Sequence, residues 1–252
     1  MSIEGKVAMV TGGSGALGRV HCLSLARAGC NIAVTGHSHL EKAEAVAKEI
    51  QTMGRKAIAV KMDVADLDEV QKGVEKVKEE LGPVDILVNN AAFGIVRGVT
   101  IVRMDKKDWN RDVSVNLTGA FNTIKCCMSD MLERGWGRII NISSISGTMG
   151  GIGQCSYAAT KAGLIGLTKT VALEGARKGV TCNAIVLGVF DGGSFYEVAP
   201  EFRERIVKRL ALRRMGDPQE LSNVLVFLAS EESGYLTGEA IEVSGGASLF
   251  TF

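Results

Sequence analysis

The chain has 252 residues, of which 46% are hydrophobic and 23% are charged, and its formal net charge is +1. A nearly neutral chain has no long-range field that attracts polyanions, and no cluster of Lys and Arg alternates with aromatic residues, so nucleic acid is excluded as the main partner. No apolar run approaches the roughly 20 residues that a membrane span needs, so no membrane partner is expected.

The remaining composition indicates one reduced, cytoplasmic domain. The start MSIEGKVAMV lacks the basic start and the long apolar core of a signal peptide. Only three prolines occur and no linker-like run divides the chain, so residues 1–252 are predicted to form a single domain. The six cysteines form no C-x-x-C pair and have no neighbouring His at ligand spacing, so we expect no metal site.

The first 28 residues are typical of a nucleotide-binding unit. An apolar run at 6–10 is followed by the letters TGGSGALG and then by a helical pattern. Glycines let the backbone approach a phosphate, and the free N–H groups of the new helix attract it. The G-x-G-x-x-G spelling is weak alone, and its position after the first strand strengthens it. The expected cofactor contacts here are Gly12, Ser14, Gly15, Leu17 and Gly18.

The second predicted strand, at 32–35, ends where a dinucleotide-binding fold reads the adenosine ribose. An acidic side chain there would accept a hydrogen bond from the 2′-hydroxyl of NAD, and residues 34–39 contain none. NADP(H) is therefore favoured over NAD(H), with His37 and Ser38 as candidate phosphate donors. The alternative is that these two residues belong to a polar turn that caps the helix beginning near Leu40.

Strands and helices keep alternating along the chain, and each unit has about the 30 residues that a parallel crossover requires. The next predicted elements are helix 40–53, strand 57–62, helix 67–81 and strand 85–89. The predicted fold is an α/β, Rossmann-like, doubly wound parallel sheet of about seven strands with helices on both faces. Such sheets bind ligands at the carboxyl ends of their strands, where the expected cofactor contacts are Asp63, Val64, Asn90 and Ala91. Asp63 is either an adenine contact or a helix N-cap.

A long amphipathic helix is predicted at 106–133. It contains Asn116 close to Gly119, and both residue types are poor in a helix interior. The sequence therefore predicts a local irregularity near Asn116 with a structural or functional cause.

The strongest chemical candidates follow that helix. A strand at 138–142 leads to Ser144, and after a Gly-rich loop a second helix carries Tyr157 and Lys161. Four residues apart, Tyr157 and Lys161 share one helix face, where an ammonium would lower the pKa of the phenol. Tyr157 could then donate and accept a proton, while Ser144 binds the oxygen on which charge develops. Alone, Tyr-x-x-x-Lys is a weak motif that needs its context.

The last part of the chain combines regular and irregular segments. The predicted elements are strand 180–186, a segment without clear periodicity at 187–200, helix 201–210, a helix ending near Ser230 and strand 240–243. Because long irregular loops are often lids, residues 187–212 are predicted to form a substrate loop or lid.

The motifs taken together resemble the short-chain dehydrogenase/reductase family over essentially the whole chain. The resemblance rests on TGGSGALG, NNAA at Asn89, Asn116 in VNLTGAF, Ser144 in NISS, Tyr157-x-x-x-Lys161 and the ending TGEAIEVSGG. Within the family, the chain is most similar to 3-oxoacyl-[acyl-carrier-protein] reductases and acetoacetyl-CoA reductases. The implied activity is NAD(P)-dependent hydride transfer between nicotinamide and a ketone or secondary alcohol, most plausibly a 3-oxoacyl thioester.

The resemblance also implies roles for individual residues. Tyr157 would exchange a proton with the substrate oxygen, and Lys161 would lower the pKa of Tyr157 and hold the nicotinamide ribose. Ser144 would orient the substrate oxygen, and Asn116 would support a water chain to Lys161. Gly188 is a further cofactor contact, so Tyr157, Lys161 and Gly188 complete the predicted cofactor site. The family's common homotetramer is expected, with the small residues of the Tyr157 helix at an interface.

Some positions depart from the family pattern, and other functions stay open. Ala16 replaces a glycine near the phosphates, Leu187 replaces a proline, and Gly192 stands where a threonine holds the nicotinamide carboxamide. A steroid, polyol or other secondary-alcohol dehydrogenase is the main alternative. A non-catalytic dinucleotide sensor is a weaker one, and the longer sugar-nucleotide epimerases need a larger C-terminal region than 252 residues leave.

Overall fold

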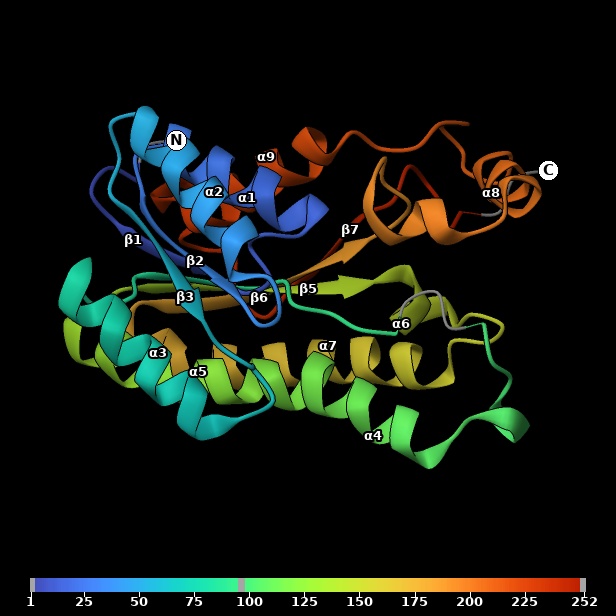
Figure 1. Cartoon of the computed structure of the whole chain (residues 1–252), viewed down its shortest axis with the longest axis horizontal. Coiled ribbons are helices and arrows are strands. Elements are labelled where there is room, and N and C mark those ends of the chain that lie inside the picture. The colour runs from blue at the N-terminus through green and yellow to red at the C-terminus, as the bar shows by residue number, and fades with distance from the viewer. Residues whose placement is uncertain (1–2, 95–97, 250–252) are drawn as a thin grey trace.

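A seven-stranded, entirely parallel sheet forms the centre of the molecule (Figure 1). The computed structural model describes residues 3–94 and 98–249. The strand order is β3-β2-β1-β4-β5-β6-β7. The strands are β1 (Val7–Val10), β2 (Asn31–Gly36), β3 (Ala57–Lys61), β4 (Ile86–Asn89), β5 (Gly137–Ser144), β6 (Val180–Leu187) and β7 (Ala240–Val243). The predicted doubly wound parallel sheet is confirmed.

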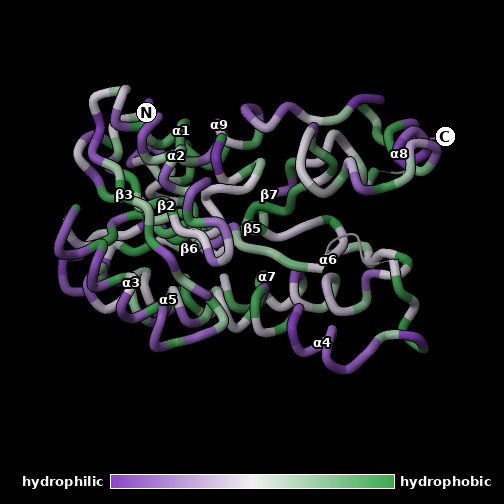
Figure 2. The backbone as a smooth tube through the Cα atoms, viewed as in Figure 1, coloured by the Kyte–Doolittle hydropathy of each residue, from purple (hydrophilic) through white to green (hydrophobic). Residues whose placement is uncertain are grey.

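Helices cover both faces of the sheet. Figure 1 shows α1, α2 and α9 on one face and α3, α5 and α7 on the other, and each group packs on its own hydrophobic cluster. The α-helices are α1 (Ala16–Arg27), α2 (Leu40–Thr52), α3 (Leu67–Glu80), α4 (Lys106–Val113), α5 (Gly119–Arg134), α6 (Ile145–Met149), α7 (Cys155–Gly175), α8 (Pro200–Val207) and α9 (Pro218–Ala229). Figure 2 shows hydrophobic residues concentrated along the strands, whereas α4 is mostly hydrophilic. No helix within the described ranges is long and apolar enough to cross a membrane.

The irregularity predicted near Asn116 is confirmed. Between α4 and α5, residues Ser114–Thr118 form one turn of π-helix, so the helix predicted at 106–133 is continuous in space but changes its winding at Asn116. Such π-turns are rare and are frequent at functional sites. The short helix α6, in contrast, lies where the sequence indicated a Gly-rich loop. Ser144 caps it, because its Oγ accepts a hydrogen bond from the Ser146 N–H at 3.2 Å.

A buried polar network ties the central strands to the helices behind them. The Asn89 side chain donates to Asn141 Oδ1 at 2.8 Å and accepts from the Thr123 hydroxyl at 2.6 Å. Asn141 in turn donates to Thr168 Oγ1 at 2.9 Å. Four elements, β4, β5, α5 and α7, are therefore held in one register by side chains that would be costly to bury unpaired.

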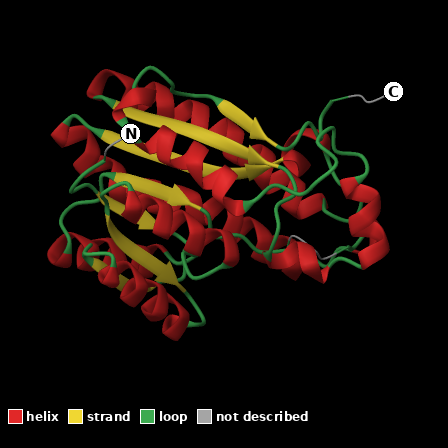
Figure 3. Ribbon diagram, turned by 90° about the horizontal axis from the view of Figure 1, so that it is seen from above, coloured by secondary structure: helices red, strands yellow, loops and turns green. Residues whose placement is uncertain are grey.

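The region after β6 is less regular, as predicted. It contains a 3₁₀ turn at Gly193–Glu197 and α8, and it returns to the sheet through a turn bonded to the chain leaving β6. The last turn before α9 is well specified, because Asp217 and Glu220 form a capping box around Pro218. In Figure 3 these segments lie beyond the arrowheads of the strands, at the carboxyl edge of the sheet.

Candidate active site

Ser144, Tyr157 and Lys161 meet at the carboxyl end of β5. Ser144 is the last residue of β5, and the two others lie in the first two turns of α7, which packs against that strand. The Ser144 hydroxyl hydrogen-bonds the phenol of Tyr157. Tyr157 is 4% exposed and Lys161 1% exposed. The spacing that placed Tyr157 and Lys161 on one helix face therefore brings them together with Ser144 in a nearly dry site.

Burial controls the ionisation of both groups. It raises the pKa of Tyr157 to about 12, with the hydrogen bond from Ser144 acting in the opposite direction. It lowers the pKa of Lys161 to about 8. The expectation that Lys161 lowers the pKa of the phenol is wrong for this structure. The Lys161 Nζ lies 5.5 Å from the centre of the Tyr157 ring and donates to the Ile142 carbonyl at 2.7 Å, and desolvation dominates.

Two contacts fix the position of α7 against β5 and α6. The Ser143 hydroxyl is fully buried and donates to the Lys161 carbonyl at 2.7 Å. Gly147 of α6 lies so close to α7 that a Cβ there would be 2.7 Å from the Ala162 nitrogen. The backbone that carries Lys161 is thus held from two sides.

Asn116 connects the end of β4 with α7. Its Oδ1 accepts from the Phe93 N–H at 2.7 Å, and its Nδ2 donates to the Phe93 carbonyl at 2.9 Å and to Thr160 Oγ1 at 3.2 Å. The π-turn is what directs this side chain inward, toward the residue before Lys161. Asn116 lies near the catalytic candidates, as the sequence predicted, and its described bonds are to the loop after β4 and to α7.

The glycine-rich turn after β1 fits a phosphate-bearing cofactor. Gly12 has φ +62°, and a Cβ at Gly18 would lie 2.2 Å from the Gly12 carbonyl oxygen, so α1 can approach the turn only because residue 18 is glycine. Asn90 braces the turn by donating to the carbonyls of Thr11 at 2.9 Å and Gly12 at 3.2 Å. The Asn90 side chain therefore holds the glycine-rich turn in position by bonding its carbonyls.

The start of α1 is suited to an anion. Gly15 is its N-cap and supplies no side-chain hydrogen bond, and the first turn has no acidic residue. Its N–H groups and the positive end of the helix dipole are thus available to a phosphate. Ser14 lies beside the end of β2, where a Cβ at Gly36 would be 3.3 Å from its Oγ. Leu17 is partly buried and packs on the core behind the turn.

The residues after β2 and β3 lie together at the predicted adenosine end. His37 Nε2 is 3.5 Å from Asp63 Oδ2, and the Ser38 hydroxyl is 3.0 Å from His37 Nδ1. Neither His37 nor Ser38 caps α2, whose N-cap is His39 with no side-chain bond, so the capping alternative is wrong. The N-cap of α3 is Asp66, so that alternative for Asp63 is also wrong. Asp63 Oδ1 accepts from the Ala65 N–H at 3.0 Å in a local turn.

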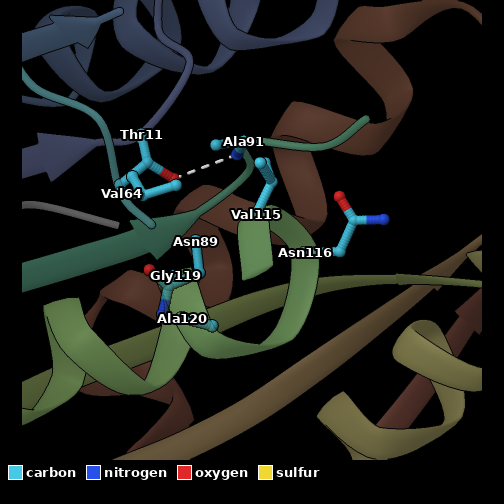
Figure 4. Close-up of a pocket in the computed structure, with 8 residues that line it drawn as sticks. All are labelled: Thr11, Val64, Asn89, Ala91, Val115, Asn116, Gly119 and Ala120. Carbon is cyan, nitrogen blue, oxygen red and sulfur yellow. Dashed lines mark hydrogen bonds between the residues drawn. The ribbon is translucent and has the colours of Figure 1, made fainter. Parts of the chain in front are cut away.

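A small cavity of about 10 Å³, about the size that holds one water molecule, lies under the end of β4 (Figure 4). Val64, Ala91 and Asn116 are among the residues that line it. Val64 is held there because the Asn122 side chain donates to its carbonyl at 2.9 Å.

Gly188, the last of the predicted cofactor contacts, follows β6, and its N–H donates to the Val243 carbonyl at 2.9 Å.

Sequence reasoning missed several residues that position the site. Thr11 is buried, and its Oγ1 accepts from the N–H groups of Asn90 at 2.9 Å and Ala91 at 3.0 Å; Figure 4 draws the second bond. Asp112 of α4 is fully buried and accepts from the Ser156 hydroxyl, next to Tyr157. Thr11 directly follows the apolar run of β1 and could have been noticed there, whereas Asp112 belongs to a mostly hydrophilic helix whose sequence does not indicate its burial. No group of side chains suited to a metal ion occurs in the described part of the chain.

Comparisons with known proteins agree with this geometry. A family model described as short chain dehydrogenase matches residues 6–201. The chain is 41% identical to the 3-oxoacyl-[acyl-carrier-protein] reductase FabG of Staphylococcus aureus (strain Mu50) over 241 residues, which cover 96% of this chain and 97% of the relative. It is 42% identical to the acetoacetyl-CoA reductase of Rhizobium meliloti (strain 1021) over 244 residues, covering 96% and 98%.

A solved structure shares the complete fold. It is that of a protein from Agrobacterium tumefaciens, provisionally described as a gluconate dehydrogenase, with a TM-score of 0.95 and 32% identity over 99% of this chain and 98% of that one. The family model and the relatives span the sheet, the glycine-rich turn and the site around Tyr157. The chain therefore belongs to the short chain dehydrogenase family and is an oxidoreductase of that family.

Proposed function

We propose that this protein reduces the ketone of a 3-oxoacyl thioester to a secondary alcohol, with NADP(H) as the cofactor. The observation that carries the proposal is the buried arrangement of Ser144, Tyr157 and Lys161 beside a glycine-rich turn suited to a dinucleotide. The 41% and 42% identity to a 3-oxoacyl-[acyl-carrier-protein] reductase and an acetoacetyl-CoA reductase supports the choice of substrate class.

The protonated phenol of Tyr157 is the form that ketone reduction requires. A phenol whose pKa is raised to about 12 stays protonated at neutral pH, and the protonated form is the one that can donate to a carbonyl oxygen as it becomes an alkoxide. Ser144 donates a hydrogen bond toward the same position and stabilises the developing negative charge. When bound, the nicotinamide supplies the hydride.

Lys161 is suited to replace the proton that Tyr157 gives up. Its pKa of about 8 lies near the working pH, so it exchanges a proton more easily than a surface lysine does. Asn116, which binds Phe93 and Thr160, keeps the end of β4 and α7 at a fixed separation around this ammonium. We propose that Asn116 also anchors the water through which Lys161 recovers its proton.

The cofactor is assigned to the carboxyl ends of β1, β2 and β4. Gly12, Ser14, Gly15 and Gly18 would receive the phosphates at the start of α1. The absence of an acidic residue at 34–39 supports NADP(H) rather than NAD(H), with His37 and Ser38 facing the 2′-phosphate. Asp63 lies beside this turn, with its Oδ2 3.5 Å from His37 Nε2.

Exposed apolar side chains support an acyl substrate. Large hydrophobic residues remain exposed on the segments that follow β4, β5 and β6, where a soluble protein without an apolar ligand gains nothing from them. They are Phe93, Met149, Ile152, Tyr196, Phe202 and Leu212. We propose that residues 187–212 act as a lid that brings part of this set over the acyl chain.

Assembly and location complete the proposal. The outward face of α7 carries the exposed small residues Ala159, Ala162 and Gly166, a surface that allows another helix to approach closely, and we propose a cytoplasmic homotetramer built on it. Light scattering would give about four times the 26.7 kDa chain mass for a tetramer.

A direct assay tests the activity. Purified protein is mixed with NADPH or NADH and a panel of ketones that includes acetoacetyl-CoA, a steroid and a keto-sugar acid, and the loss of the reduced nicotinamide signal is followed. We expect acetoacetyl-CoA with NADPH to give the highest kcat/KM, and Tyr157→Phe to lower it by about 10³-fold. A clear preference for the keto-sugar acid or for NADH would replace this assignment with a polyol dehydrogenase or an NAD enzyme.

A further inference from the structure

The segment 200–215 concentrates positive charge at the carboxyl edge of the sheet. It holds six Lys and Arg residues against two Glu residues, in a chain whose net charge is +1. The segment consists of α8 and the turn that follows it, and Figure 1 shows α8 beyond the ends of the strands, at the edge of the sheet where β5 ends in Ser144. A charged segment at this edge attracts the anionic part of a ligand whose other end reaches the site.

A pocket lies within this segment. It is open to solvent, measures about 450 Å³ and lies between α8 and the turn, a volume that suits part of a small-molecule ligand. Its walls include apolar side chains and charged ones: Val207, Met215, Arg203, Glu204, Lys208 and Arg213.

Some charged side chains of the pocket are paired with each other, and others have no charged partner among the described residues. Glu204 and Lys208 form an ion pair at 2.6 Å and largely cancel one another. Arg203 lies 4.8 Å over the ring of Tyr196, and its Nε is buried without a hydrogen-bond partner. The side chain of Arg213 forms no hydrogen bond or ion pair with any residue that the structure describes. Two guanidinium groups therefore remain for an outside anion.

The backbone at Arg213 is strained. Its φ is +54°, and among the described residues it is the one non-glycine with a positive φ. A long side chain in the left-handed region costs free energy that glycine would avoid, and such outliers gather at functional sites. An arginine rather than a glycine at this position is explained if its guanidinium binds an anionic ligand.

Backbone hydrogen bonds connect the pocket to the segment that follows β6, the strand paired with β5. The Gly216 N–H donates to the Val189 carbonyl at 3.0 Å, and the Asp191 N–H donates to the Gly216 carbonyl at 2.8 Å. Leu187, two residues before Val189, is paired with Ser144 in the sheet. A ligand held by Arg213 would therefore sit at one end of the loop that leaves β6 beside Ser144.

We propose that this pocket binds a phosphate group of the pantetheine thioester that carries the 3-oxoacyl chain, with Arg203 and Arg213 as the ligands of the phosphate. This inference rests on the proposed function. Guanidinium groups form paired, charge-assisted hydrogen bonds with phosphate oxygens, and Val207 and Met215 offer an apolar wall to the carbon chain beside it. Coenzyme A and the prosthetic group of acyl carrier proteins share this phosphate chemistry.

Kinetics with two esters of one acyl group test the proposal. Acetoacetyl-CoA carries phosphates, and acetoacetyl-N-acetylcysteamine carries none. We expect Arg213→Gly, which suits the backbone at φ +54°, to raise KM for the CoA ester about 10-fold and leave its kcat and both constants for the phosphate-free ester unchanged. Arg213→Lys should recover part of the loss. The matched control is Arg209→Ala, an exposed cation of the same segment outside the pocket, which should leave KM within about 2-fold.

Acetoacetyl-4′-phosphopantetheine distinguishes the phosphates. An equal rise in KM for this ester assigns the pocket to the pantetheine phosphate, and a rise confined to the CoA ester assigns it to the adenosine phosphates. An Arg213→Gly effect of equal size on the phosphate-free ester would overturn the proposal, because the residue would then only shape the loop. No effect on any ester would overturn it as well.

Titration calorimetry with free coenzyme A separates this inference from the proposed function. If the wild-type protein reduces neither ester, the proposed function fails, and the pocket is still judged by binding. A dissociation constant about 10-fold weaker in Arg213→Gly than in the wild type supports it. Equal affinity, or no binding by the wild type, contradicts it.

Discussion

The two sides of the candidate site are built differently. On one side, β5, α6 and α7 hold Ser144, Tyr157 and Lys161 in a nearly water-free contact, and buried hydrogen bonds such as that from Ser143 to the Lys161 carbonyl fix the backbone. On the other side, the segment at 188–217 is exposed, charged and irregular, and it contains the strained Arg213.

This difference assigns proton transfer to the buried side and substrate recognition to the exposed side. Removal of water raises the pKa of Tyr157 and lowers that of Lys161. At neutral pH Tyr157 therefore keeps its proton, whereas Lys161 can exchange one. Side chains on the exposed side of the site lie outside this buried cluster, so they can change without disturbing it. Substitutions on the buried side should therefore alter rate or stability strongly, and those on the exposed side should alter substrate affinity.

The largest expected effect is that of Lys161→Met. We expect kcat to fall about 10³-fold, because the proton relay is lost. We also expect unfolding at pH 7 to become harder by about 1 to 2 kcal/mol, since burial of the ammonium is costly and the lost bond to Ile142 offsets part of the gain. Chemical denaturation at several pH values measures the second effect.

The pH dependence of that stability has a defined sign. Because the folded pKa of Lys161 is about 8 and the ordinary value for lysine is 10.5, the unfolded chain binds more protons between these values, and wild-type stability gains from this group as pH rises through them. The gain from pH 8 to 10 should be absent in Lys161→Met. Identical wild-type and variant profiles would contradict the burial of the ammonium.

Next in size is Gly147→Ala, which tests the packing of α6 on α7. A Cβ at this position would lie 2.7 Å from the Ala162 nitrogen, so one helix must move, at a cost of about 1 to 3 kcal/mol. We expect kcat/KM to fall about 10- to 100-fold because the shift displaces Lys161. Thr148→Ala, one residue along on the exposed side of α6, is the control and should behave like the wild type.

A third prediction concerns stability at low pH and the contact between α1 and α9. His21 of α1 is buried against α9, where Nδ1 lies 2.8 Å from the Ser222 hydroxyl and Nε2 has no partner, and burial lowers its pKa to about 4. Its folded pKa is below the ordinary histidine value of 6.5, so stability present above pH 6.5 is lost as pH falls toward 4, by about 3 kcal/mol in total.

The measurement is the free energy of unfolding between pH 7 and 4. In His21→Gln the slope that belongs to this residue should disappear, whereas His39→Gln, at an exposed histidine, should retain it. A wild-type slope that survives in His21→Gln would show that other groups control the acid transition.

The smallest effect is expected on the exposed side, for Phe202→Ser. The ring is 58% exposed, so the free energy of unfolding should change by less than about 0.5 kcal/mol. If Phe202 contacts the acyl chain, KM for a long-chain 3-oxoacyl thioester should rise about 3- to 10-fold, while KM for acetoacetyl-CoA stays constant. Equal changes for both chain lengths would assign the residue to the shape of the lid.

Much of the buried framework was predictable, because its signals are local. Alternation of apolar runs with helical patterns gave the parallel sheet, and the two poor helix formers around Asn116 indicated the π-turn. The i, i+4 spacing of Tyr157 and Lys161 determined that they share a face.

The remaining features depend on contacts between distant residues. Burial of Tyr157, which reverses the expected direction of its pKa shift, follows from packing that no local pattern encodes. The capping of α3 by Asp66 rather than Asp63 was decided by where the chain turns, because both residues are aspartates and suit a cap equally well. The bond between Asp112 and Ser156 joins residues 44 positions apart.

A crystal structure of the protein with NADP⁺ and a 3-hydroxyacyl thioester tests the central claim most directly. The account predicts that the Tyr157 hydroxyl lies within about 3 Å of the substrate hydroxyl, with Ser144 bonded to the same oxygen. A complex in which the substrate oxygen lies out of hydrogen-bond reach of Tyr157, with the thioester bound and the phenol still buried beside Ser144, would contradict it.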